Sequence, residues 1–345
     1  MRNLMIPPIL SGNEITVSVI MTTYNGQEYV WEQLQSLYSQ TRTPDEVIIS
    51  DDHSTDGTAT IIENFIVKHG LSNWTLTINQ VNLGWQRNFN QAIGRVTGDV
   101  IFLSDQDDIW LPDKIEVMTQ VMLQNSHVQC LSGRLETIDN LGRSITECSF
   151  PAGGNSGRVQ MKRFSKRFNT TILLGCTLSF RRPIAEMITN LGVTHYSHDE
   201  QVCRLATLLD GLYILDRPVI KYRLHDTNSS GVVRGSGRGS SSLDARALSI
   251  RSNLDWLDAI LTRIPDGTWP ESKLRVLCKT RAMQAARLTF LATKRLREFL
   301  RLMRFLPYYS GISMFLGDFA YTYGLQIHAA RIHRRLRPAS HTVRT

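Results

Sequence analysis

The sequence predicts an α/β protein whose sheet is mostly parallel and flanked by helices, with a helical region added at the C-terminus. Over roughly residues 15–125, short apolar runs rich in β-branched residues alternate with helical patterns. Strands and helices at this spacing are joined by right-handed crossovers, which makes the strands parallel. A Gly/Ser/Arg-rich stretch at 228–242 then separates the last expected strand from a long helical pattern.

The first part of the chain supplies four expected strands, each followed by an expected helix. The strands are short, apolar in the interior and rich in β-branched residues. Asp56 suits the N-cap of the second helix, and Pro112 suits the first turn of the fourth. The expected strands are residues 15–22, 45–52, 76–80 and 99–104, and the expected helices are residues 29–40, 56–69, 84–95 and 112–124.

The next region is mixed. Strand-like runs occupy VQCLSGRLETI (128–138) and ILLGCTLSF (172–180), and residues 199–209 show an amphipathic helical pattern. YILDRPVIKYRLH (213–225) predicts two short strands separated at its proline. From residue 243 onward the pattern is helical.

The 345 residues have the composition of an ordinary folded protein, with 42% hydrophobic and 20% charged residues. Five scattered cysteines without a CxxC pair predict reduced thiols in a cytoplasmic setting. The N-terminal stretch MRNLMIPPILSGNE is too polar for a secretory signal. The sequence contains no uninterrupted apolar run of about 18 residues, so we expect no transmembrane helix.

The net charge of +8 is distributed unevenly. Residues 1–240 contain 21 Lys+Arg and 24 Asp+Glu, a net of −3, whereas residues 241–345 contain 18 and 7, a net of +11. Within the basic part, residues 273–305 combine apolar helical spacing with Lys and Arg, and residues 306–327 are rich in aromatic side chains. This pattern predicts either docking on an anionic membrane surface or a dimer interface. Nucleic acid is not an expected partner, because no recognised motif accompanies the charge.

Polar clusters follow three of the four expected parallel strands. They are Thr22–Asn25, Asp51–Ser54 and Asp105–Asp108. Ligands of such sheets bind beyond the carboxyl ends of the strands. We therefore expect the three clusters to line one ligand site.

The three acidic residues within Asp105–Asp108 are unfavourable without a compensating charge, because close carboxylates disfavour each other's ionisation. Asp105 and Asp107 have the spacing DxD, and hard oxygen ligands select Mg²⁺ or Mn²⁺. A divalent cation held there would bridge a diphosphate and neutralise charge as the diphosphate departs. The alternative interpretation is a solvated acidic turn.

Four segments together resemble the signature segments of family 2 glycosyltransferases in order and in spacing. They are TTYNG (22–26), SDDHSTDGT (50–58), NLGWQRNFNQAI (82–93) and FLSDQDDIWLPDKI (102–115). The later segment 197–231 is similar to the second half of these enzymes, and most of all to the bacterial rhamnosyltransferase-like branch that builds surface polysaccharides. The resemblance covers about residues 15–231.

The resemblance implies the GT-A fold and a domain organisation. A glycosyltransferase domain would span residues 1–230, with a nucleotide-binding half over about 15–125 and an acceptor half over about 126–230. A flexible linker or lid would follow at 231–242, and a basic helical region at 243–345.

The resemblance also implies which residues bind the nucleotide-sugar. Thr23, Tyr24 and Asn25 would contact the base and ribose. Asp51 or Asp52 would accept a hydrogen bond from the imide N–H of the base. Three further residues stand where the family approaches the nucleotide-sugar: Asn82, Gly84 and Arg87.

Four residues would carry the metal and the chemistry. Asp107 would ligate the metal directly, Asp105 would stand nearer the ribose, and His225 would touch the metal or phosphate. Asp199 fills the position of the catalytic base, which takes the proton of an acceptor hydroxyl. The following EQV stands where this branch often has aromatic residues, which leaves the acceptor open. Taken singly, His198 and His225 are more typical of surface histidines.

The implied function is an inverting, metal-dependent transfer of a sugar from a nucleoside diphosphate to a glycan or lipid-linked glycan. dTDP-rhamnose is the donor that the resemblance favours, and the cytoplasmic face of the membrane is the expected place. Two other functions fit less well. One is a non-catalytic GT-A-like scaffold at the membrane. The other is a sugar-phosphate nucleotidyltransferase, although TTYNGQEY lacks the glycine-rich loop and basic residue of such enzymes.

Overall fold

The computed structural model describes residues 4–5, 15–145, 155–170, 173–225, 242–265 and 267–325. The expected linker or lid at 231–242 lies outside the described residues except for its last residue. The end of the expected helical region, beyond residue 325, also lies outside them. The chain divides into two compact units, one formed by residues 1–237 and 262–269 and the other by residues 238–261 and 270–345.

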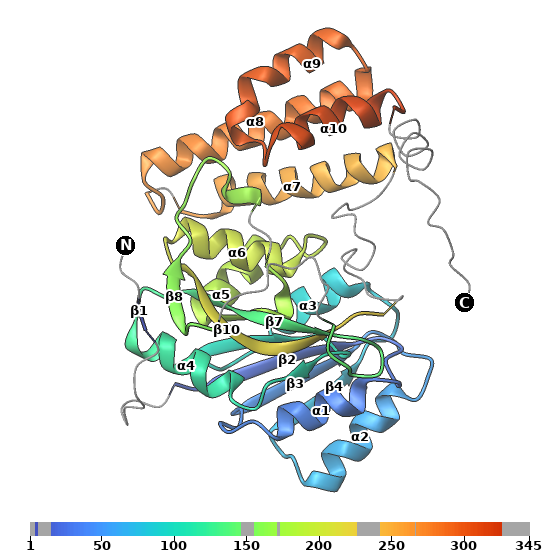
Figure 1. The fold of residues 1–345 in the computed structure, drawn as a ribbon. Helices are drawn as coiled ribbons and strands as arrows, with labels where there is room; N and C mark the ends of the chain where they lie inside the picture. The colour runs from blue at the N-terminus through green and yellow to red at the C-terminus, as the bar shows by residue number, and fades with distance from the viewer. Residues whose placement is uncertain are drawn as a thin grey trace, which may run out of the picture. The chain divides into compact units, whose positions relative to one another are not determined.

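A mixed, 10-stranded sheet forms the centre of the first unit (Figure 1). Its strands are Leu4–Met5 (β1), Val17–Thr23 (β2), Glu46–Asp51 (β3), Trp74–Ile78 (β4), Val100–Ser104 (β5), Ile109–Trp110 (β6), Cys130–Ile138 (β7), Arg158–Met161 (β8), Leu178–Arg181 (β9) and Leu212–Arg223 (β10). The strand order is β1-β8-β10-β7-β9-β5-β2-β3-β4, and β6 pairs with β10. Strands β5, β2, β3 and β4 are parallel, as the alternation of strands and helices predicts, whereas β9 is antiparallel to both β5 and β7.

Helices pack on both faces of this sheet. Those of the first unit are Val30–Tyr38 (α1), Thr58–His69 (α2), Trp85–Ile93 (α3), Lys114–Gln124 (α4), Arg182–Leu191 (α5) and His198–Leu208 (α6), with 3-10 turns at Phe168–Thr170 (η1) and Gly175–Thr177 (η2). Because side chains alternate along a strand, Val17, Val19 and Met21 of β2 share one core with α1, α2 and α4. Helices α3, α5 and α6 pack together, and Figure 1 shows α5 and α6 on the face opposite α1 and α2.

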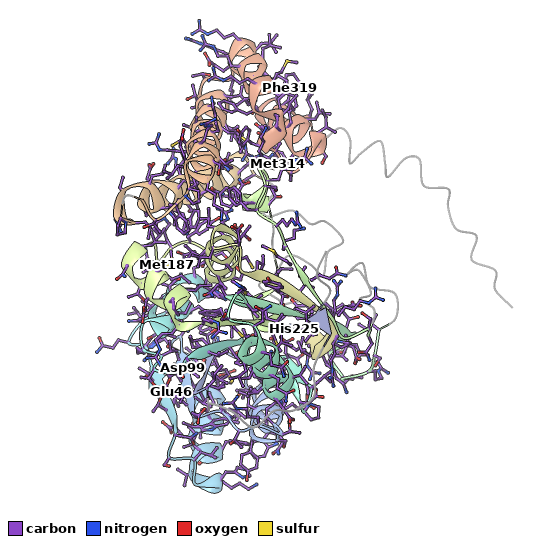
Figure 2. The ribbon with its side chains drawn as sticks, turned by 90° about the vertical axis from the view of Figure 1, so that its left-hand side faces the viewer. Glu46, Asp99, Met187, His225, Met314 and Phe319 are labelled. Atoms are coloured by element: carbon purple, nitrogen blue, oxygen red, sulfur yellow. The ribbon has the colours of Figure 1, made fainter. Side chains whose placement is uncertain are left out.

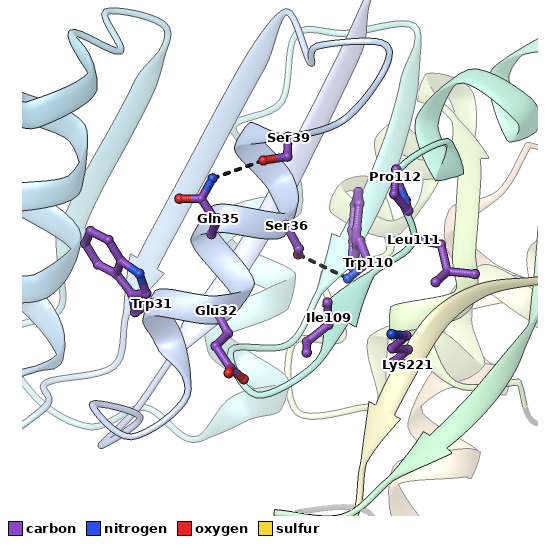
Figure 3. Close-up of a pocket in the computed structure, with 10 residues that line it drawn as sticks. All are labelled: Trp31, Glu32, Gln35, Ser36, Ser39, Ile109, Trp110, Leu111, Pro112 and Lys221. Carbon is purple, nitrogen blue, oxygen red and sulfur yellow. Dashed lines mark hydrogen bonds between the residues drawn. The ribbon is translucent and has the colours of Figure 1, made fainter. Parts of the chain in front are cut away.

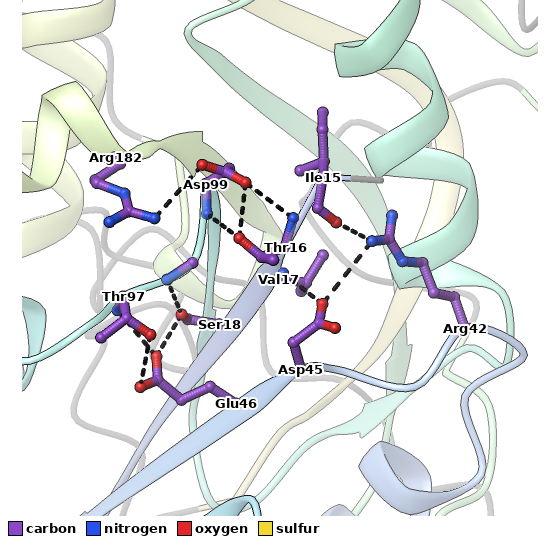
Figure 4. Close-up of polar contacts among 11 residues, drawn as sticks. Ile15, Thr16, Val17, Ser18, Arg42, Asp45, Glu46, Thr97, Asp99 and Arg182 are labelled. Atoms are coloured by element: carbon purple, nitrogen blue, oxygen red, sulfur yellow. Dashed lines mark hydrogen bonds and ion pairs between the residues drawn. The ribbon is translucent and has the colours of Figure 1, made fainter. Parts of the chain in front are cut away.

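The acids at the amino ends of the parallel strands join one strand to the next (Figure 4). Asp99 accepts hydrogen bonds from the Thr16 amide and hydroxyl at 3.0 and 2.7 Å, and these bonds lower its pKa. Asp45 accepts one from the amide of Val17 at 2.8 Å. Each of these carboxylates accepts hydrogen bonds from residues at the start of β2, so the acids at the amino ends of the strands stabilise the sheet.

Three details differ from the expected elements. Strand β10 runs through Pro218 as one strand, and its register against β7 shifts there, because a proline lacks the N–H of the ladder. Within the expected strand 172–180, residues 175–177 form the turn η2, and only residues 178–180 are in a strand, the first part of β9. The N-cap of α2 is Gly57 rather than Asp56, although the Asp56 carboxylate still accepts the amide of Thr58 at 3.0 Å.

The described part of the second unit is helical. Its elements are Leu243–Arg263 (α7), whose last two residues belong to the first unit, Glu271–Thr293 (α8), Leu296–Leu302 (α9), Met303–Tyr308 (η4) and Ile312–Thr322 (α10). Asp318 is fully buried and accepts hydrogen bonds from Arg287, Arg246 and the hydroxyl of Tyr309, all at 2.8–2.9 Å. Burial opposes its charge, but the two guanidinium groups hold its pKa below the usual value. None of the described helices combines the length and the apolar character that a membrane crossing requires.

Candidate active site

The carboxyl ends of β5, β2 and β3 lie side by side, because these strands are parallel neighbours in that order. Residue 51 pairs with residue 23, and residue 104 pairs with residue 21. The three polar clusters therefore meet at one edge of the sheet, as the sequence predicts. Figure 2 shows His225, which follows β10, well apart from Glu46 and Asp99 at the amino ends of β3 and β5.

Asp51 is fully buried at the end of β3 and organises the first two clusters. Its Oδ1 accepts the hydroxyls of Thr23 at 2.7 Å and Ser54 at 2.6 Å, and its Oδ2 accepts the amide of Ser54 at 2.8 Å. The carboxylate thus ties the end of β2 to the loop after β3. It retains one acceptor position, because a carboxylate can accept about four hydrogen bonds.

Asp52 holds the loop between β4 and α3. Its Oδ1 accepts the side chain of Asn79 at 2.9 Å and the amide of Leu83 at 2.8 Å, and its Oδ2 accepts the amide of Gly84 at 2.8 Å. Asn82 donates to the Asp52 carbonyl at 3.2 Å. Gly84 has φ 82°, a left-handed conformation that favours glycine. The predicted residues 52, 82 and 84 therefore form one assembly, and Arg87 is exposed on the first turn of α3.

The loop after β2 is held by Gln106 from the middle of the acidic cluster. The amide of Tyr24 donates to Gln106 Oε1 at 2.7 Å, and Gln106 Nε2 donates to the Tyr24 carbonyl at 3.0 Å. A Cβ at Gly26 would lie 2.3 Å from the Gln106 side chain, so a larger residue there would displace this amide from Tyr24. Asn25 has φ 47°, and its side chain accepts the amide of Thr55 at 2.8 Å. The side chain of Tyr24 stays 47% exposed at the sheet edge.

The acidic cluster separates into two parts. His225 Nε2 lies 2.8 Å from Asp107 Oδ2, so two of the three predicted metal ligands are in contact. Asp105 instead groups with Asp108 and Cys176, whose ligand atoms all lie within 4.8 Å of one another. Asp108 is fully buried, and its Oδ1 accepts a backbone amide at 3.0 Å. No nitrogen or oxygen of the described residues donates to its Oδ2.

This cluster is short of positive charge. Burial, followed by the charges of Asp107 and Asp199, raises the pKa of Asp105 to about 7. Burial and the same acidic loop raise the pKa of Asp108 well above its usual value. One buried cation, Lys114, donates to the carbonyl of Cys176 at 2.6 Å, and burial lowers its own pKa to about 7. The loop is therefore an electrostatic environment that favours an additional cation.

The donor set fits a hard divalent cation such as Mg²⁺ or Mn²⁺. The loop carries three carboxyl groups, of which Asp107 contacts His225, and carboxylate oxygens are the ligands that these ions prefer. The thiol of Cys176 does not fit as a ligand, because burial raises its pKa well above the usual value and keeps it protonated. The Cys176 thiol instead hydrogen-bonds to Asp108, whose other carboxylate oxygen accepts the amide of Arg223.

Arg223 at the end of β10 positions the acidic loop, although sequence reasoning did not identify it. Its amide donates to Asp108 Oδ1 at 3.0 Å, and its Nε donates to the Asp107 carbonyl at 2.8 Å. Its guanidinium also donates to the Asn140 carbonyl at 3.1 Å and pairs with Glu32 of α1. The side chain is only 1% exposed. A basic residue two positions before a predicted ligand, in a buried strand, is the sequence signal that could have indicated it.

Asp199 stands on the first turn of α6 with its carboxyl close to the acidic loop. The amide of Glu200 donates to its Oδ1 at 2.8 Å, and the Ser197 hydroxyl contacts the same oxygen. Burial is the largest cause that raises its pKa. A Cβ at Gly175 would lie 3.6 Å from the Asp199 Cβ, and Gly175 directly precedes Cys176 of the acidic cluster. The charge of Asp199 also raises the pKa of Asp105. The structure thus brings the predicted base to the predicted metal cluster.

His198 is a buried packing residue, so the interpretation of it as a surface histidine is wrong. Its ring stacks on Phe89 with centroids 3.8 Å apart and meets the edge of Trp85 at 5.8 Å. Burial lowers its pKa to about 3, which keeps it neutral. A Cβ at Gly175 would lie 2.9 Å from its Nε2. These contacts fix the start of α6, and with it Asp199.

A buried amide pair connects α3 to the segment before Asp199. Asn90 Nδ2 donates to the carbonyls of Thr194 at 3.0 Å and Tyr196 at 2.9 Å. Gln201 Nε2 donates to Asn90 Oδ1 at 2.9 Å. Because α3 also begins at the loop held by Asp52, the two sides of the site share one hydrogen-bonded frame.

A groove of about 540 Å³ lies beside this site between α1 and β6 (Figure 3). It is lined by Trp31, Glu32, Gln35, Ser36, Ser39, Ile109, Trp110, Leu111, Pro112 and Lys221. None of the predicted site residues is among these. The groove is joined to the acidic loop through Glu32, which forms an ion pair with Arg223.

Comparisons with known proteins identify the family and the relatives of this chain. Residues 18–188 match the model of the glycosyl transferase family 2. The chain is 27% identical over 225 residues to the dTDP-rhamnosyl transferase RfbG of Shigella flexneri, covering 61% of this chain and 73% of that protein. It is 25% identical over 224 residues to an uncharacterized glycosyltransferase of Nostoc sp., covering 62% of this chain and 66% of that protein. The chain thus spans about two thirds of the length of the first curated relatives it matches.

Among solved structures, the fold is similar to that of S. aureus TarS 1–349 in complex with UDP-GlcNAc. The TM-score is 0.54 with 18% sequence identity, and the match covers 91% of this chain and 83% of TarS 1–349. This likeness concerns the fold, which is the GT-A fold that the sequence motifs imply. The match over residues 18–188 and the relatives named as glycosyltransferases show that the chain belongs to glycosyl transferase family 2 and is a glycosyltransferase.

Proposed function

We propose that this glycosyltransferase moves a sugar from a nucleoside diphosphate to a hydroxyl of a glycan or lipid-linked glycan, with Asp199 as the catalytic base. The observation that carries the proposal is the meeting of the nucleotide-side loops, the acidic cluster and Asp199 at one sheet edge. The electrostatic coupling of Asp105 to both Asp107 and Asp199 supports this arrangement. A donor diphosphate and an acceptor hydroxyl would be held on either side of the transferred sugar.

The nucleotide would bind against the loops after β2 and β3. Tyr24 is exposed at the edge and suits contact with the base or ribose, next to Thr23 and Asn25. Asp51 and Asp52 each accept three hydrogen bonds inside the protein, so each has about one acceptor position left for the imide N–H of a base. Both are retained as candidates. Asn82, Gly84 and Arg87 would form the wall nearest the sugar and diphosphate, with the Arg87 guanidinium suited to phosphate.

Asp105, Asp107 and His225 would hold Mg²⁺ or Mn²⁺. Such an ion, when bound, neutralises the charge that develops on the departing diphosphate. The contact between Asp107 and His225 supports this assignment, and the charge deficit of the loop supports the need for a cation. Asp108 and Arg223 would position the acidic loop through their hydrogen bonds between β10 and the loop.

Asp199 would accept the proton of the acceptor hydroxyl as the new C–O bond forms. Its raised pKa makes it a stronger base than an exposed aspartate. The bond to the diphosphate breaks on the opposite face of the sugar, so the anomeric configuration is inverted. The Glu200 amide and the Ser197 hydroxyl stabilise the ionised carboxylate in the meantime.

The identity of the donor is proposed from the relatives. The similarity to a dTDP-rhamnosyl transferase favours dTDP-rhamnose, which would enter bacterial surface polysaccharide. Synthesis of such glycans on lipid carriers would place this protein in the cytoplasm, at the inner face of the membrane, with the basic second unit toward the lipid.

Turnover tests this proposal against a silent scaffold. We would incubate the protein with dTDP-rhamnose and other sugar nucleotides, a membrane lipid extract as acceptor source, and Mn²⁺, Mg²⁺ or EDTA, and measure the nucleoside diphosphate released. Metal-dependent release from one donor is expected from the wild type and from Glu63→Gln, which changes an exposed acid on α2. Asp199→Asn should bind that donor without turning it over. Nucleotide binding without release by any variant would support the scaffold instead.

A further inference from the structure

The α9 segment presents an exposed apolar ridge. Leu296 and Leu300 are 56% and 55% exposed, and Met303, directly after the helix, is 52% exposed. Positions four residues apart lie on one face of a helix, so the two leucines project together. Three large apolar side chains in a row at a surface mark an interaction site more often than chance exposure does.

The orientation of this ridge is fixed by the adjacent face of α9, which carries Phe299 and Leu302. Phe299 stacks on Phe315 with centroids 4.6 Å apart and contacts Phe319 at 4.8 Å. Leu302 is fully buried in the same cluster. With Phe299 and Leu302 turned into the core of the second unit, helix geometry turns Leu296 and Leu300 outward.

A basic stripe runs beside the ridge. Arg297, Arg301 and Arg304 are all exposed, and they follow the three apolar residues by one position each. Lys294 and Arg295 precede them, and both are exposed as well. Glu298 is the single acid in residues 294–304 and pairs with Arg297 and Arg301. Five basic residues against one acid give this short segment a net charge of +4.

Helix α10 supplies a second exposed pair of the same kind. Ile312 and Leu316 are 64% and 53% exposed and also stand four residues apart. Gly311 precedes them, and α10 has a single charged residue, the buried Asp318. The second unit therefore offers exposed apolar side chains on two consecutive helices, with the basic stripe on the first.

We propose that α9, with its ridge Leu296-Leu300-Met303 and its stripe Arg297-Arg301-Arg304, docks this protein on an anionic lipid bilayer. The apolar side chains would enter the boundary between headgroups and acyl chains, while the arginine side chains reach back to lipid phosphates. Guanidinium forks bind phosphate oxygens in pairs, which suits a headgroup layer. A protein partner would need an acidic side chain opposite each arginine, whereas an anionic bilayer presents negatively charged phosphates at every position.

The biological purpose of this docking rests on the proposed function, because a lipid-linked acceptor would lie in the same surface. Lipid binding itself needs no turnover. The two ideas can therefore fail separately, since donor binding and vesicle binding are measured on the same protein.

The test uses the full chain with vesicles of phosphatidylcholine, with and without phosphatidylglycerol, in a flotation assay. One variant replaces the ridge by Leu296→Asn, Leu300→Asn and Met303→Asn. The other replaces the stripe by Arg297→Gln, Arg301→Gln and Arg304→Gln. The matched controls are Leu248→Asn, at a leucine 65% exposed on α7, and Arg275→Gln, at an arginine 70% exposed on α8.

We expect wild type and controls to float with phosphatidylglycerol vesicles and not with phosphatidylcholine alone. Each arginine near an anionic surface contributes about fivefold in partitioning, so the stripe variant should lose at least roughly tenfold, and its salt dependence should weaken while Lys294 and Arg295 remain. The ridge variant should lose binding while keeping some salt dependence. Equal flotation of wild type and both variants would overturn the proposal. A second result would also overturn it: the ridge variant floats like the wild type, but the wild type is a dimer in solution and the ridge variant a monomer. The ridge would then be an interface between two copies of the chain. Circular dichroism melting and nucleotide calorimetry report whether each variant is folded.

Discussion

Replacing Arg223 by methionine tests whether the acidic loop is positioned from β10. Arg223→Met keeps much of the apolar stem but removes every donor of the guanidinium. The carbonyls of Asp107 and Asn140, which accept at 2.8 and 3.1 Å, would lose their donors; Asp107 is half-buried, whereas Asn140 is exposed to water. A buried acceptor left unsatisfied costs about 1–3 kcal/mol, and water can replace the donor at exposed Asn140, so the Asp107 carbonyl alone predicts a loss of about 1–3 kcal/mol in the free energy of unfolding.

The partner acid gives the matched comparison. Glu32 is 54% exposed, and an ion pair with such an exposed partner is worth about 0–1 kcal/mol. Glu32→Gln should therefore destabilise the protein by less than about 1 kcal/mol, although it breaks the same ion pair. The asymmetry between the two variants separates a role in holding carbonyls from a role in charge pairing.

Urea unfolding at a constant m-value measures the stability change, and calorimetry with a nucleoside diphosphate and Mn²⁺ measures the site. Arg223→Met should also weaken metal-dependent nucleotide binding by roughly tenfold or more, about 1.4 kcal/mol, because Asp107 is released. If Arg223→Met were no less stable than Glu32→Gln and bound nucleotide like the wild type, the positioning role would be refuted.

Three further predictions concern the base, the frame and the second unit. Asp199→Asn should lower kcat by about 10²–10⁴-fold with little change in donor affinity, and wild-type activity should rise with pH through a pKa above the usual aspartate value, since the base acts when deprotonated. Asn90→Ala should lower kcat more than it raises KM, because the segment before Asp199 loses two hydrogen bonds and Gln201 on α6 loses one, and Asn90→Asp should not restore it. Asp318→Asn should destabilise the second unit by about 3–5 kcal/mol in thermal or urea unfolding, because it leaves two arginines without a charge partner.

The pH dependence of Asp318 has a definite sign. Its pKa is lower in the folded protein than the ordinary value, so its contribution to stability is present above the unfolded pKa and is lost as pH falls through the folded pKa. Acid unfolding of the wild-type second unit should therefore begin below about pH 4. This loss of stability at low pH should be absent in Asp318→Asn. If stability fell with pH equally in the wild type and in Asp318→Asn, the role of Asp318 and its two arginines would be contradicted.

The order of elements and the meeting of three polar clusters could be predicted from the sequence, because both depend on local patterns. Short β-branched runs alternating with helices determine the parallel strands β2 to β5, and parallel neighbours bring their carboxyl ends together. The family resemblance then adds Asp199 and His225, which are distant in sequence. The contact of Asp107 with His225 at 2.8 Å agrees with that expectation.

The parts that sequence could not predict depend on long-range packing. Lys114 and Arg223 have the composition of surface residues, yet both are buried, because the acidic loop supplies charges and carbonyls for them. His198 is buried because α3 places Phe89 and Trp85 against it. Strand β9 pairs antiparallel between β5 and β7, a position that only the complete sheet defines.

Binding of nucleoside diphosphates by calorimetry tests the central claim most directly. We would titrate dTDP, UDP and GDP into wild type and Asp107→Ala, each with Mn²⁺ and with EDTA. The Asp107 carbonyl, which Arg223 uses, remains in the variant, so the loop keeps its anchor while the carboxylate is removed. The proposed site predicts that one nucleotide binds wild type with Mn²⁺ and that EDTA or Asp107→Ala abolishes this binding. Equal binding in all four conditions, or none in any, would contradict a metal-bound nucleotide-sugar site at the end of β5.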